Sequence, residues 1–371
     1  MVALMRESLK NTVQHTKSAH AGLLLTHSLP VWENDGAKPE KSKLIDKITG
    51  VNCCSLYQKA FERWLNVTCD VGQFASLSAS LTGRLMMGLN TGGGIETGFS
   101  VHHSYGMPMI AGSSVKGAVR AYAETIGLGK EYIAALFGAD EDLAKEAHTH
   151  ESAGYLVWHD AWWIPESNHK PFVGEVVTVH HQDYYGGNGA ATDFDSPIPN
   201  QQLAVQGSFY FVVEGDSAWT SLAITLLNKT LEQQGIGSKR AAGYGFMKSN
   251  TELHNQLNKQ QKQAQEQLKK EQETTKLEEA MASLSDNQKQ IQAFVIKLSQ
   301  NTTWQNGNAG TDVMGFAQLA KTVEDWPDTN DIKFAIAMFE EQVPKWLKKP
   351  IKDNKNWKER INNLKRKAGL L

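Results

Sequence analysis

One short segment of the chain has the residue types of a helix N-terminus that binds an anion: glycine and serine, followed by two cations. Gly112, Ser113 and Ser114 are typical of a loop that leads into a helix, because a serine hydroxyl can cap the free amides of the first turn. Those amides and the positive end of the helix dipole attract phosphate. Lys116 and Arg120 follow four residues apart and would share one helix face. The segment therefore predicts a contact with a sugar-phosphate backbone.

A second segment far downstream, residues 235–245, has the same kind of composition. Its glycines, Gly237 among them, let the backbone approach a ligand closely. Lys239 and Arg240 place charge at the centre of the loop, and Tyr244 offers a ring for stacking on a base. Either segment alone is compatible with a simple tight turn. Together they predict one phosphate-binding surface that is built from two distant parts of the chain.

The longer pattern around both segments resembles a known protein family. The stretch from Glu96 to Arg120 and the stretch that ends in Gly243-Tyr-Gly245 resemble glycine-rich segments of the RAMP proteins of CRISPR systems. Three further stretches follow the order of the sixth-named subunit family of type III-B (Cmr) effector complexes: residues 154–161, 179–185 and 193–199. The likeness covers about residues 80–250 and does not include the C-terminal part of the chain.

The resemblance implies both a fold and a function. The fold is α+β, with an RRM-like (ferredoxin-like) RAMP core that carries insertions and a C-terminal all-helical extension. The function is that of a non-catalytic RNA-binding subunit of a type III-B effector complex. This subunit caps the backbone filament and holds the 3′ part of the guide RNA in antiviral defence, while guide pairing reads the target. A β-hairpin within residues 160–205 would wedge between base pairs of the guide–target duplex.

The resemblance also implies partners and contact residues. The expected partners are guide (CRISPR) RNA, target RNA, the backbone RAMP subunit and a neighbouring head subunit, and no cofactor is expected. Cations would contact guide phosphates, and hydroxyls and loop amides would add neutral donors. The residues that we expect to contact RNA are Ser113, Ser114, Lys116, Arg120, Gly237, Lys239, Arg240, Tyr244 and His102.

Charge is distributed unevenly along the chain, although its net value is only −2. Residues 1–250 carry 19 Lys and Arg against 24 Asp and Glu, whereas residues 251–371 carry 19 against 16. An RNA contact in the first part must therefore be a local groove of cations rather than a general field. The basic end of the chain, from Lys345 onward, would be a solvated face or would touch RNA or an acidic neighbour.

Cysteine usage and hydropathy indicate a cytoplasmic protein without a membrane partner. Cys53, Cys54 and Cys69 do not have the paired spacing of a zinc site or a disulfide framework, so we expect reduced thiols. No apolar run approaches the ~18 residues that a membrane-spanning helix needs. The first residues also lack the apolar core of a signal peptide.

The pattern of apolar residues predicts three parts: an RNA-binding RAMP domain at 1–250, a charged helical linker at 251–285 and a small helical domain at 286–371. Within the first part, strands are expected near 22–26 and at 74–89, 155–158, 173–179 and 207–214. Helices are expected at 51–66, 117–126, 132–137 and 218–233, and a loop at 184–199. This mixture is typical of an antiparallel α+β domain.

Histidine and aspartate residues raise the alternative of catalysis. His102-His103 and His180-His181 form adjacent pairs. Neighbouring residues of a strand face opposite sides, so neither pair is expected to hold one metal ion. Three aspartates lie in or beside turns, where they more often form turns or caps than catalyse a reaction: Asp160, Asp193 and Asp195.

Two rival functions follow from these residues. The first is a metal-independent RAMP-type endoribonuclease that processes guide RNA, with His102, His103 or His180 as the general acid or base. The second is a protein scaffold in which the glycine-rich segments only build turns. The aromatic pairs Trp162-Trp163 and Tyr184-Tyr185 would stack on bases or pack in the core, and core packing is favoured for at least one of the tryptophans.

Overall fold

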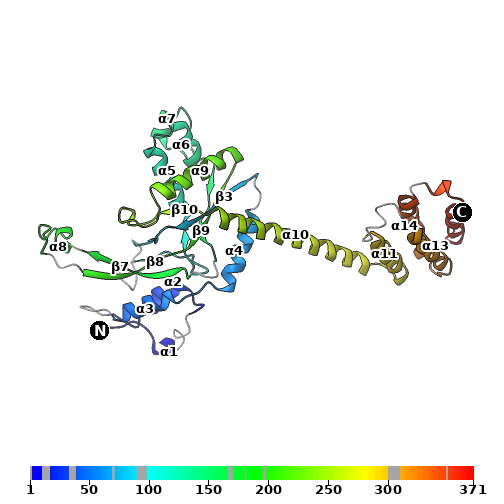
Figure 1. Cartoon of the computed structure of the whole chain (residues 1–371), viewed down its shortest axis with the longest axis horizontal. Helices are drawn as coiled ribbons and strands as arrows, with labels where there is room; N and C mark the ends of the chain where they lie inside the picture. Colours follow the sequence, from blue (N-terminus) through cyan, green and yellow to red (C-terminus); the bar gives the residue numbers. More distant parts are fainter. Residues whose placement is uncertain are drawn as a thin grey trace. The chain divides into compact units, whose positions relative to one another are not determined.

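The computed structural model describes residues 2–10, 17–32, 39–68, 72–89, 98–165, 170–179, 181–194, 198–299, 310–347 and 350–371. The chain divides into two compact units, Met1–Gln265 and Glu266–Leu371. Helix α10 (Thr251–Ala282) contains the boundary between them (Figure 1). Each unit has its own hydrophobic core, so each is described separately.

Unit 1 is built on one antiparallel sheet with two long helices. In chain order its central elements are β3 (Phe74–Leu81), α5 (Gly112–Thr125), β6 (Ala161–Trp163), β9 (Ser208–Glu214), α9 (Ser217–Gln233) and β10 (Met247–Ser249). This is the β-α-β-β-α-β order of the ferredoxin-like fold. The strands lie in the order β10-β3-β9-β6-β4, with β4 (Met109–Ile110) at the edge, and β5 (Val157–Trp158) also pairs with β9. The predicted α+β class with a ferredoxin-like core is confirmed.

Both faces of this sheet are buried, as the continuous apolar sequence of β9 requires. On one face, Phe209 and Phe211 pack in the main core with α5 and α9. On the other face, Tyr210 packs with Phe61 of α4 (Ser55–Val67) and Leu257 of α10. In RRM modules this second face stays open, and its aromatic side chains stack on bases. Here helices α4 and α10 cover it, so these side chains are not open to stacking.

A second, two-stranded sheet extends from unit 1 as a hairpin (Figure 1). Strand β7 (Phe172–Val179) pairs with β8 (Ile198–Val205), and the short helix α8 (Gln182–Tyr185) lies in the connection. Helix α3 (Pro39–Thr49) packs against both strands. The hairpin that the resemblance implies within residues 160–205 is therefore present.

The remaining elements of unit 1 are short. They are β1 (Val2–Ala3), α1 (Glu7–Lys10), α2 (Ala21–His27), β2 (Val31–Trp32), α6 (Lys130–Phe137) and α7 (Glu141–Glu146). Helix α6 ends at Phe137, and Gly138, whose φ is 90°, follows it as the C-cap residue. The helix predicted at 132–137 is therefore confirmed. The predicted helices at 51–66 and 218–233 and the predicted strands at 173–179 and 207–214 are also confirmed, within one to four residues at their ends.

Three predictions about local structure are wrong. Residues 22–26 form helix α2 rather than a strand, because the His20 ring accepts a hydrogen bond from the Leu23 amide at 3.2 Å and caps the helix. The strand predicted at 74–89 ends at Leu81, and beyond it Leu85 and Met86 make only isolated bridges. The loop predicted at 184–199 contains the end of α8 and the start of β8.

Every regular element in the described residues of unit 2 is a helix. The unit comprises the end of α10, then α11 (Asp286–Ser299), α13 (Gly310–Glu324), α14 (Thr329–Leu347) and α15 (Lys355–Lys367). A line of aromatic rings joins three of these helices: Phe316 lies edge-on to Phe339 at 5.8 Å, and Phe339 lies 5.7 Å from Trp357. No described helix of either unit combines the length and apolar character that a membrane crossing needs.

Candidate nucleic-acid interface

The two glycine-rich segments meet in the structure and line one cavity of about 520 Å³. Helix α5 supplies one wall and the loop after α9 supplies another. The lining residues are Leu85, Met87, Gly88, Ser100, Met109, Ile110, Ala111, Ser114, Gly117, Ala118, Ala121, Ile236, Gly237, Ser238 and Arg240. None of these residues is acidic. The cavity thus has an apolar floor, several hydroxyls and one guanidinium, which suits a phosphate-bearing chain.

The wall on α5 is formed by small side chains. Ser114, Gly117, Ala118 and Ala121 recur at three- and four-residue intervals and therefore share one helix face. A Cβ placed on Gly117 would meet no atom within 4 Å. This face leaves room for a ligand along the helix. The sequence prediction included Ser114 and missed the other three residues, whose spacing was the available signal.

The start of α5 differs from the prediction. The helix begins at Gly112 rather than near residue 117, and Ala111, not a serine, is the N-cap residue, without a side-chain cap. The Gly112 amide donates a 2.7 Å hydrogen bond to Oδ1 of Asp160. A Cβ at Gly112 would also collide with the Trp158 carbonyl oxygen. The protein's own carboxylate therefore binds the first amide of the helix, in a place where the sequence predicts phosphate.

The loop after α9 is held tightly at its base. Gly237 has a φ of 87°, and a Cβ there would lie 2.6 Å from the Met86 carbonyl oxygen. The Ser238 amide donates to that same oxygen at 2.8 Å. Gly237 is thus required both for its left-handed conformation and for the close approach of two backbones. This anchoring fixes the position of the cations that follow.

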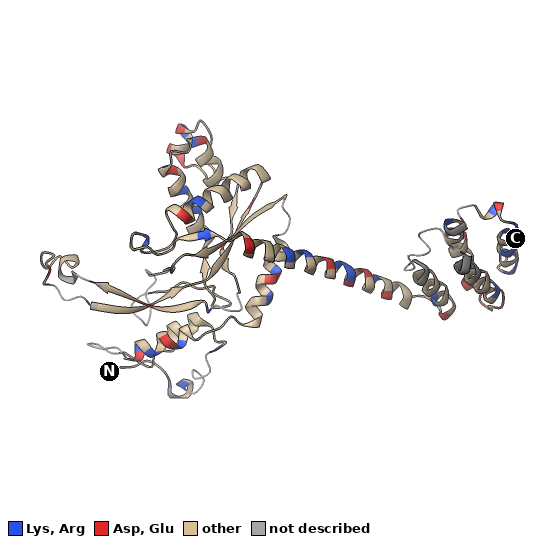
Figure 2. Ribbon diagram, in the orientation of Figure 1, with Lys and Arg blue, Asp and Glu red and all other residues tan. Residues whose placement is uncertain are grey.

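Lys239 and Arg240 lie exposed at the end of this loop (Figure 2). Lys239 itself has a φ of 56°, a left-handed conformation that is uncommon outside glycine. Among the residues that the structure describes, neither side chain forms an ion pair, and Arg240 lines the cavity. Their charges are therefore available to an anionic ligand.

Tyr244 lies beside the same loop and contacts a different group of side chains. Burial raises the pKa of its phenol, Glu175 of β7 raises it further, and Arg84 partly opposes this. Arg84 and Glu175 form an ion pair at 3.6 Å. Tyr244 is half-buried here and does not line the cavity. Its predicted stacking on a base stays a prediction.

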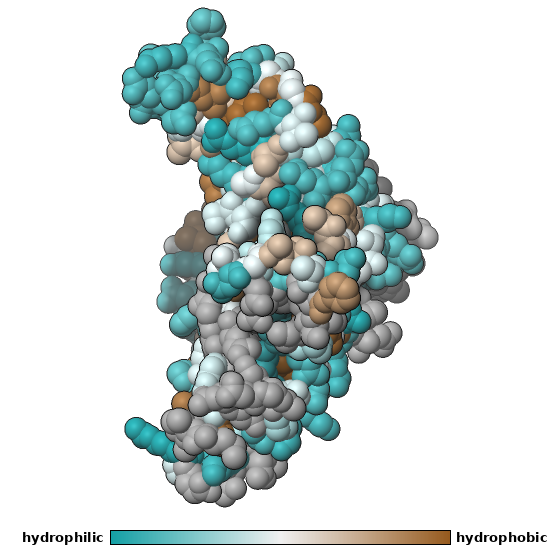
Figure 3. All heavy atoms as spheres, turned by 90° about the vertical axis from the view of Figure 1, so that its left-hand side faces the viewer, coloured by the Kyte–Doolittle hydropathy of each residue, from teal (hydrophilic) through white to brown (hydrophobic). Residues whose placement is uncertain are grey.

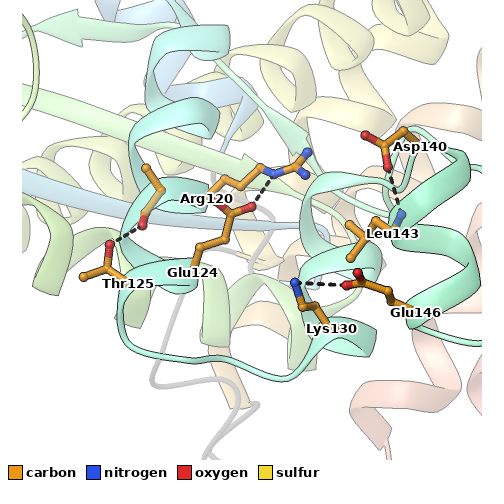
Figure 4. Close-up of polar contacts among 8 residues, drawn as sticks. Arg120, Glu124, Thr125, Lys130, Asp140, Leu143 and Glu146 are labelled. Atoms are coloured by element: carbon orange, nitrogen blue, oxygen red, sulfur yellow. Dashed lines mark hydrogen bonds and ion pairs between the residues drawn. The ribbon is translucent and has the colours of Figure 1, made fainter.

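Lys116 and Arg120 face away from the cavity. The Lys116 ammonium donates to the Ala153 carbonyl oxygen at 3.0 Å. Arg120 turns along α5 toward Glu124, with Nε 2.9 Å from Oε1 (Figure 4). Ser113 is exposed and also lies outside the lining. The structure therefore brings together Ser114, Gly237 and Arg240 of the predicted set and separates these three from Lys116 and Arg120.

His102 is part of an aromatic cluster rather than of the cavity. Its ring lies 4.7 Å from that of Tyr105 and 5.0 Å from that of Trp162, and its Nδ1 accepts from the Ser104 amide at 3.1 Å. Burial lowers the pKa of His102, and Asp160 partly opposes this shift. Trp162 stacks on Tyr57 at 5.6 Å. The cluster gives His102 a packing role in this structure.

The other candidate catalytic residues do not converge on the cavity. His103 lies with His102 in a turn, not a strand, and its carbonyl oxygen contacts the His20 ring at 2.7 Å. Asp193 is exposed in the hairpin connection. His180 and Asp195 lie outside the described residues. Within the described parts of the chain, no group of three or more His, Cys, Asp or Glu side chains is placed to hold a metal ion.

The end of the hairpin presents aromatic side chains to solvent. Tyr184, Tyr185 and Phe194 are 55%, 77% and 96% exposed. Figure 3 views unit 1 from the side on which the hairpin ends, and shows small hydrophobic areas within a largely hydrophilic surface. The sequence prediction included the tyrosine pair and missed Phe194. Trp163, by contrast, is fully buried and donates to the Gln206 carbonyl oxygen at 2.8 Å, so its predicted core role is confirmed.

Comparison with known proteins identifies the domain that contains the cavity. Residues 79–248 match the sequence profile of the RAMP superfamily. They are a RAMP domain. Both walls of the cavity, α5 and the loop after α9, lie within this RAMP domain, as does the hairpin.

The chain is also similar to named CRISPR proteins. The chain is 24% identical over 251 residues to the CRISPR system Cmr subunit Cmr6 of Pyrococcus furiosus, with 51% of this chain and 74% of the relative covered. The crystal structure of that Cmr6 matches with a TM-score of 0.32 and 22% identity, over 48% of this chain and 98% of the other. A cryo-EM structure of the type III-B Cmr-beta bound to cognate target RNA contains a chain that matches with a TM-score of 0.47 and 18% identity, over 67% of this chain and 92% of the other.

Proposed function

We propose that this protein is a non-catalytic RNA-binding subunit of a type III-B CRISPR effector complex. It would cap the backbone filament and hold the 3′ part of the guide RNA, with the backbone RAMP subunit and a head subunit as neighbours. The observation that carries the proposal is the cavity shared by α5 and the loop after α9 in a Cmr6-like RAMP domain.

The chemistry of the cavity supports a phosphate-bearing ligand. The Arg240 guanidinium and the Ser114 hydroxyl are hydrogen-bond donors on the two walls of the cavity, and no carboxylate lines it. Lys239 adds an exposed ammonium next to Arg240. Hydroxyls and cations that contact only phosphate and sugar bind the nucleic-acid backbone and do not recognise the base sequence. This is what a guide holder requires, because base pairing with the guide selects the target.

The covered sheet supports the same placement of RNA. Tyr210 on the face that RRM modules use is 1% exposed, so bases cannot stack there. The exposed aromatic side chains are instead at the end of the hairpin, where Tyr185 and Phe194 are available for stacking. We propose that the guide backbone lies in the cavity and that the end of the hairpin contacts bases of the guide–target duplex.

A salt titration with the full chain tests this proposal. Labelled single-stranded guide-like RNA is incubated in EDTA with the wild-type chain and with Lys239→Ala plus Arg240→Ala. Each phosphate contact on a single strand contributes about 0.7 to the slope of log affinity against log salt. Loss of two contacts should therefore reduce the slope by about 1.4 and weaken binding at every salt concentration.

The matched control is Lys116→Ala plus Arg120→Ala, which removes the same two residue types from the outer face of α5. Its binding should stay near that of the wild type, since neither side chain lines the cavity. Equal losses in both double variants would refute the placement of RNA in the cavity. RNA that is cut in EDTA, with cutting abolished by His102→Ala or His103→Ala, would make the protein an endoribonuclease instead.

A further inference from the structure

Unit 2 contains a second basic cavity, between α13 and the first turns of α15. Its volume is about 580 Å³. Its lining residues are Ala317, Gln318, Lys321, Asn354, Asn356, Trp357 and Arg360. Three of them are amides, two are cations and none is acidic. The cavity thus gathers hydrogen-bond donors around a space without a competing carboxylate.

The Arg360 side chain is held in place at this cavity. Its guanidinium carbon lies 5.4 Å from the centre of the Trp357 ring. Trp357 is itself 2% exposed and packs in the core of unit 2. Stacking on a fixed ring restricts the guanidinium plane and leaves its N–H groups free to bind in the plane. No ion pair is formed by Arg360 or Lys321 in the part of the chain that the structure describes.

The amide side chains add neutral donors that suit the same ligand. The Asn354 Oδ1 accepts from the Trp357 amide at 3.2 Å, which fixes the side chain. Asn356 and Gln318 are exposed on either side. Arg, Lys, Asn and Gln are side chains that contact phosphate and sugar in nucleic-acid complexes. An acidic peptide would need only the cations, whereas this set of donors matches phosphate oxygens together with ribose hydroxyls.

The surface around the cavity continues the positive charge. Helix α15, which is red near the C-terminus in Figure 1, has the sequence KNWKERINNLKRK, with six cations, drawn in blue in Figure 2, and one acid. Its apolar residues Trp357, Ile361 and Leu364 are buried, so its cations lie on the outer face, where Lys365 pairs with Glu340 at 2.7 Å. A chain of phosphates leaving the cavity would therefore meet further cations.

We propose that this cavity binds a phosphodiester segment of single-stranded RNA, with Arg360 and Lys321 on the phosphate and the amides on phosphate or ribose oxygens. The proposal rests on the proposed function, because that function makes RNA the polyanionic ligand of this chain. It adds a contact outside the RAMP domain, in the C-terminal unit. It does not depend on the cavity of unit 1.

Cross-linking of the full chain to RNA that contains 4-thiouridine tests the proposal, with peptides mapped by mass spectrometry. Wild-type protein should give cross-links at residues 354–360 of unit 2. Lys321→Gln plus Arg360→Gln keeps the aliphatic stems over Trp357 and removes both charges. These cross-links should then fall about tenfold, in line with loss of two charge-assisted contacts. A circular-dichroism melt checks that the variant is folded.

The matched control is Lys276→Gln plus Lys333→Gln, which removes two positive charges from exposed positions of unit 2 outside both the cavity and α15. Equal losses in the two variants would overturn the inference, because general electrostatic attraction would explain both. Cross-links confined to unit 1 would overturn it as well and leave the proposed function intact. Cross-links at 354–360 without any at 235–245 would support it and refute the RNA site in unit 1.

A mononucleotide distinguishes a polymer site from a site for free nucleotides. The same protein is irradiated with 4-thiouridine monophosphate at an equal nucleotide concentration. Only the RNA chain should cross-link at 354–360, because neighbouring phosphates reach the further cations of α15. Equal cross-linking by the mononucleotide would overturn the assignment to an RNA segment.

Discussion

Gly117 gives the sharpest test of the cavity in unit 1, because it lines the space without supporting the fold. It lies in the interior of α5, is exposed, and faces open space where a Cβ would be. Gly117→Ala should therefore stabilise the chain by about 0.5–1 kcal/mol through helix propensity. At about 2–4 °C per kcal/mol for a domain of this size, the melting temperature of unit 1 should rise by about 1–4 °C.

Gly117→Glu should keep this stability and lose RNA. A carboxylate about 4 Å from a phosphate is repelled by about 1 kcal/mol in water and by about 4 kcal/mol at the effective dielectric constant of a protein surface. RNA affinity in the salt titration should consequently fall by between about fivefold and about a thousandfold. The fall should shrink as salt is added.

Thr125→Glu is the control for this series. It places the same charge on the same helix, at an exposed position outside the cavity. Thr125 lies eight residues, or about 12 Å along the helix, from Gly117. This distance exceeds the Debye length of about 8 Å at physiological salt, so a carboxylate at residue 125 is largely screened from a phosphate beside residue 117. Thr125→Glu should therefore bind RNA nearly as the wild type does. If Gly117→Glu binds RNA as tightly as Gly117→Ala, the cavity is not the RNA site.

Two further predictions concern stability. Asp331, 4% exposed, accepts hydrogen bonds from Ser285, Asn287 and Gln288 at 2.7–2.9 Å, so Asp331→Ala should destabilise unit 2 by about 2–4 kcal/mol. Calorimetry should show a lower melting transition for unit 2 alone, and an equal shift of the whole trace would contradict separate cores. Burial lowers the pKa of His102 below 6.5, so the unfolded chain binds its proton more readily. Stability should thus fall as pH drops through about 6.5, and His102→Gln should reduce the fall in urea midpoints between about pH 7.5 and pH 5.5, with a remainder from His254, whose pKa burial also lowers.

The order of strands and helices was predictable because their apolar patterns are strong. Strand β9 is a continuous apolar run, and α9 shows clear helical spacing, so both lie where the sequence predicts them. The run at 22–26 was ambiguous, since a short apolar segment fits a strand or a helix equally well. The contact that decides for the helix comes from the His20 side chain.

The candidate site was predictable in its segments and only partly in its residues. Composition indicated that α5 and the loop after α9 act together, and they do meet in one cavity. Spacing also showed that Lys116 and Arg120 share a face, but it cannot show which face points to the loop. Asp160 illustrates the same limit, because its hydrogen bond to Gly112 joins residues 48 positions apart in the sequence.

The pairing of β3 with β9 has a consequence for synthesis of the chain. Its register joins Ser80 to Ser208 and Phe74 to Glu214. Ribosomes add about 5–20 residues per second, so Ser80 of β3 waits about 6–26 s for its partner Ser208 to be made. During that time its hydrogen-bonding edge is unpaired and open to other strands. Nascent unit 1 should accordingly depend on chaperones, and its yield should rise when translation of residues 81–208 is accelerated.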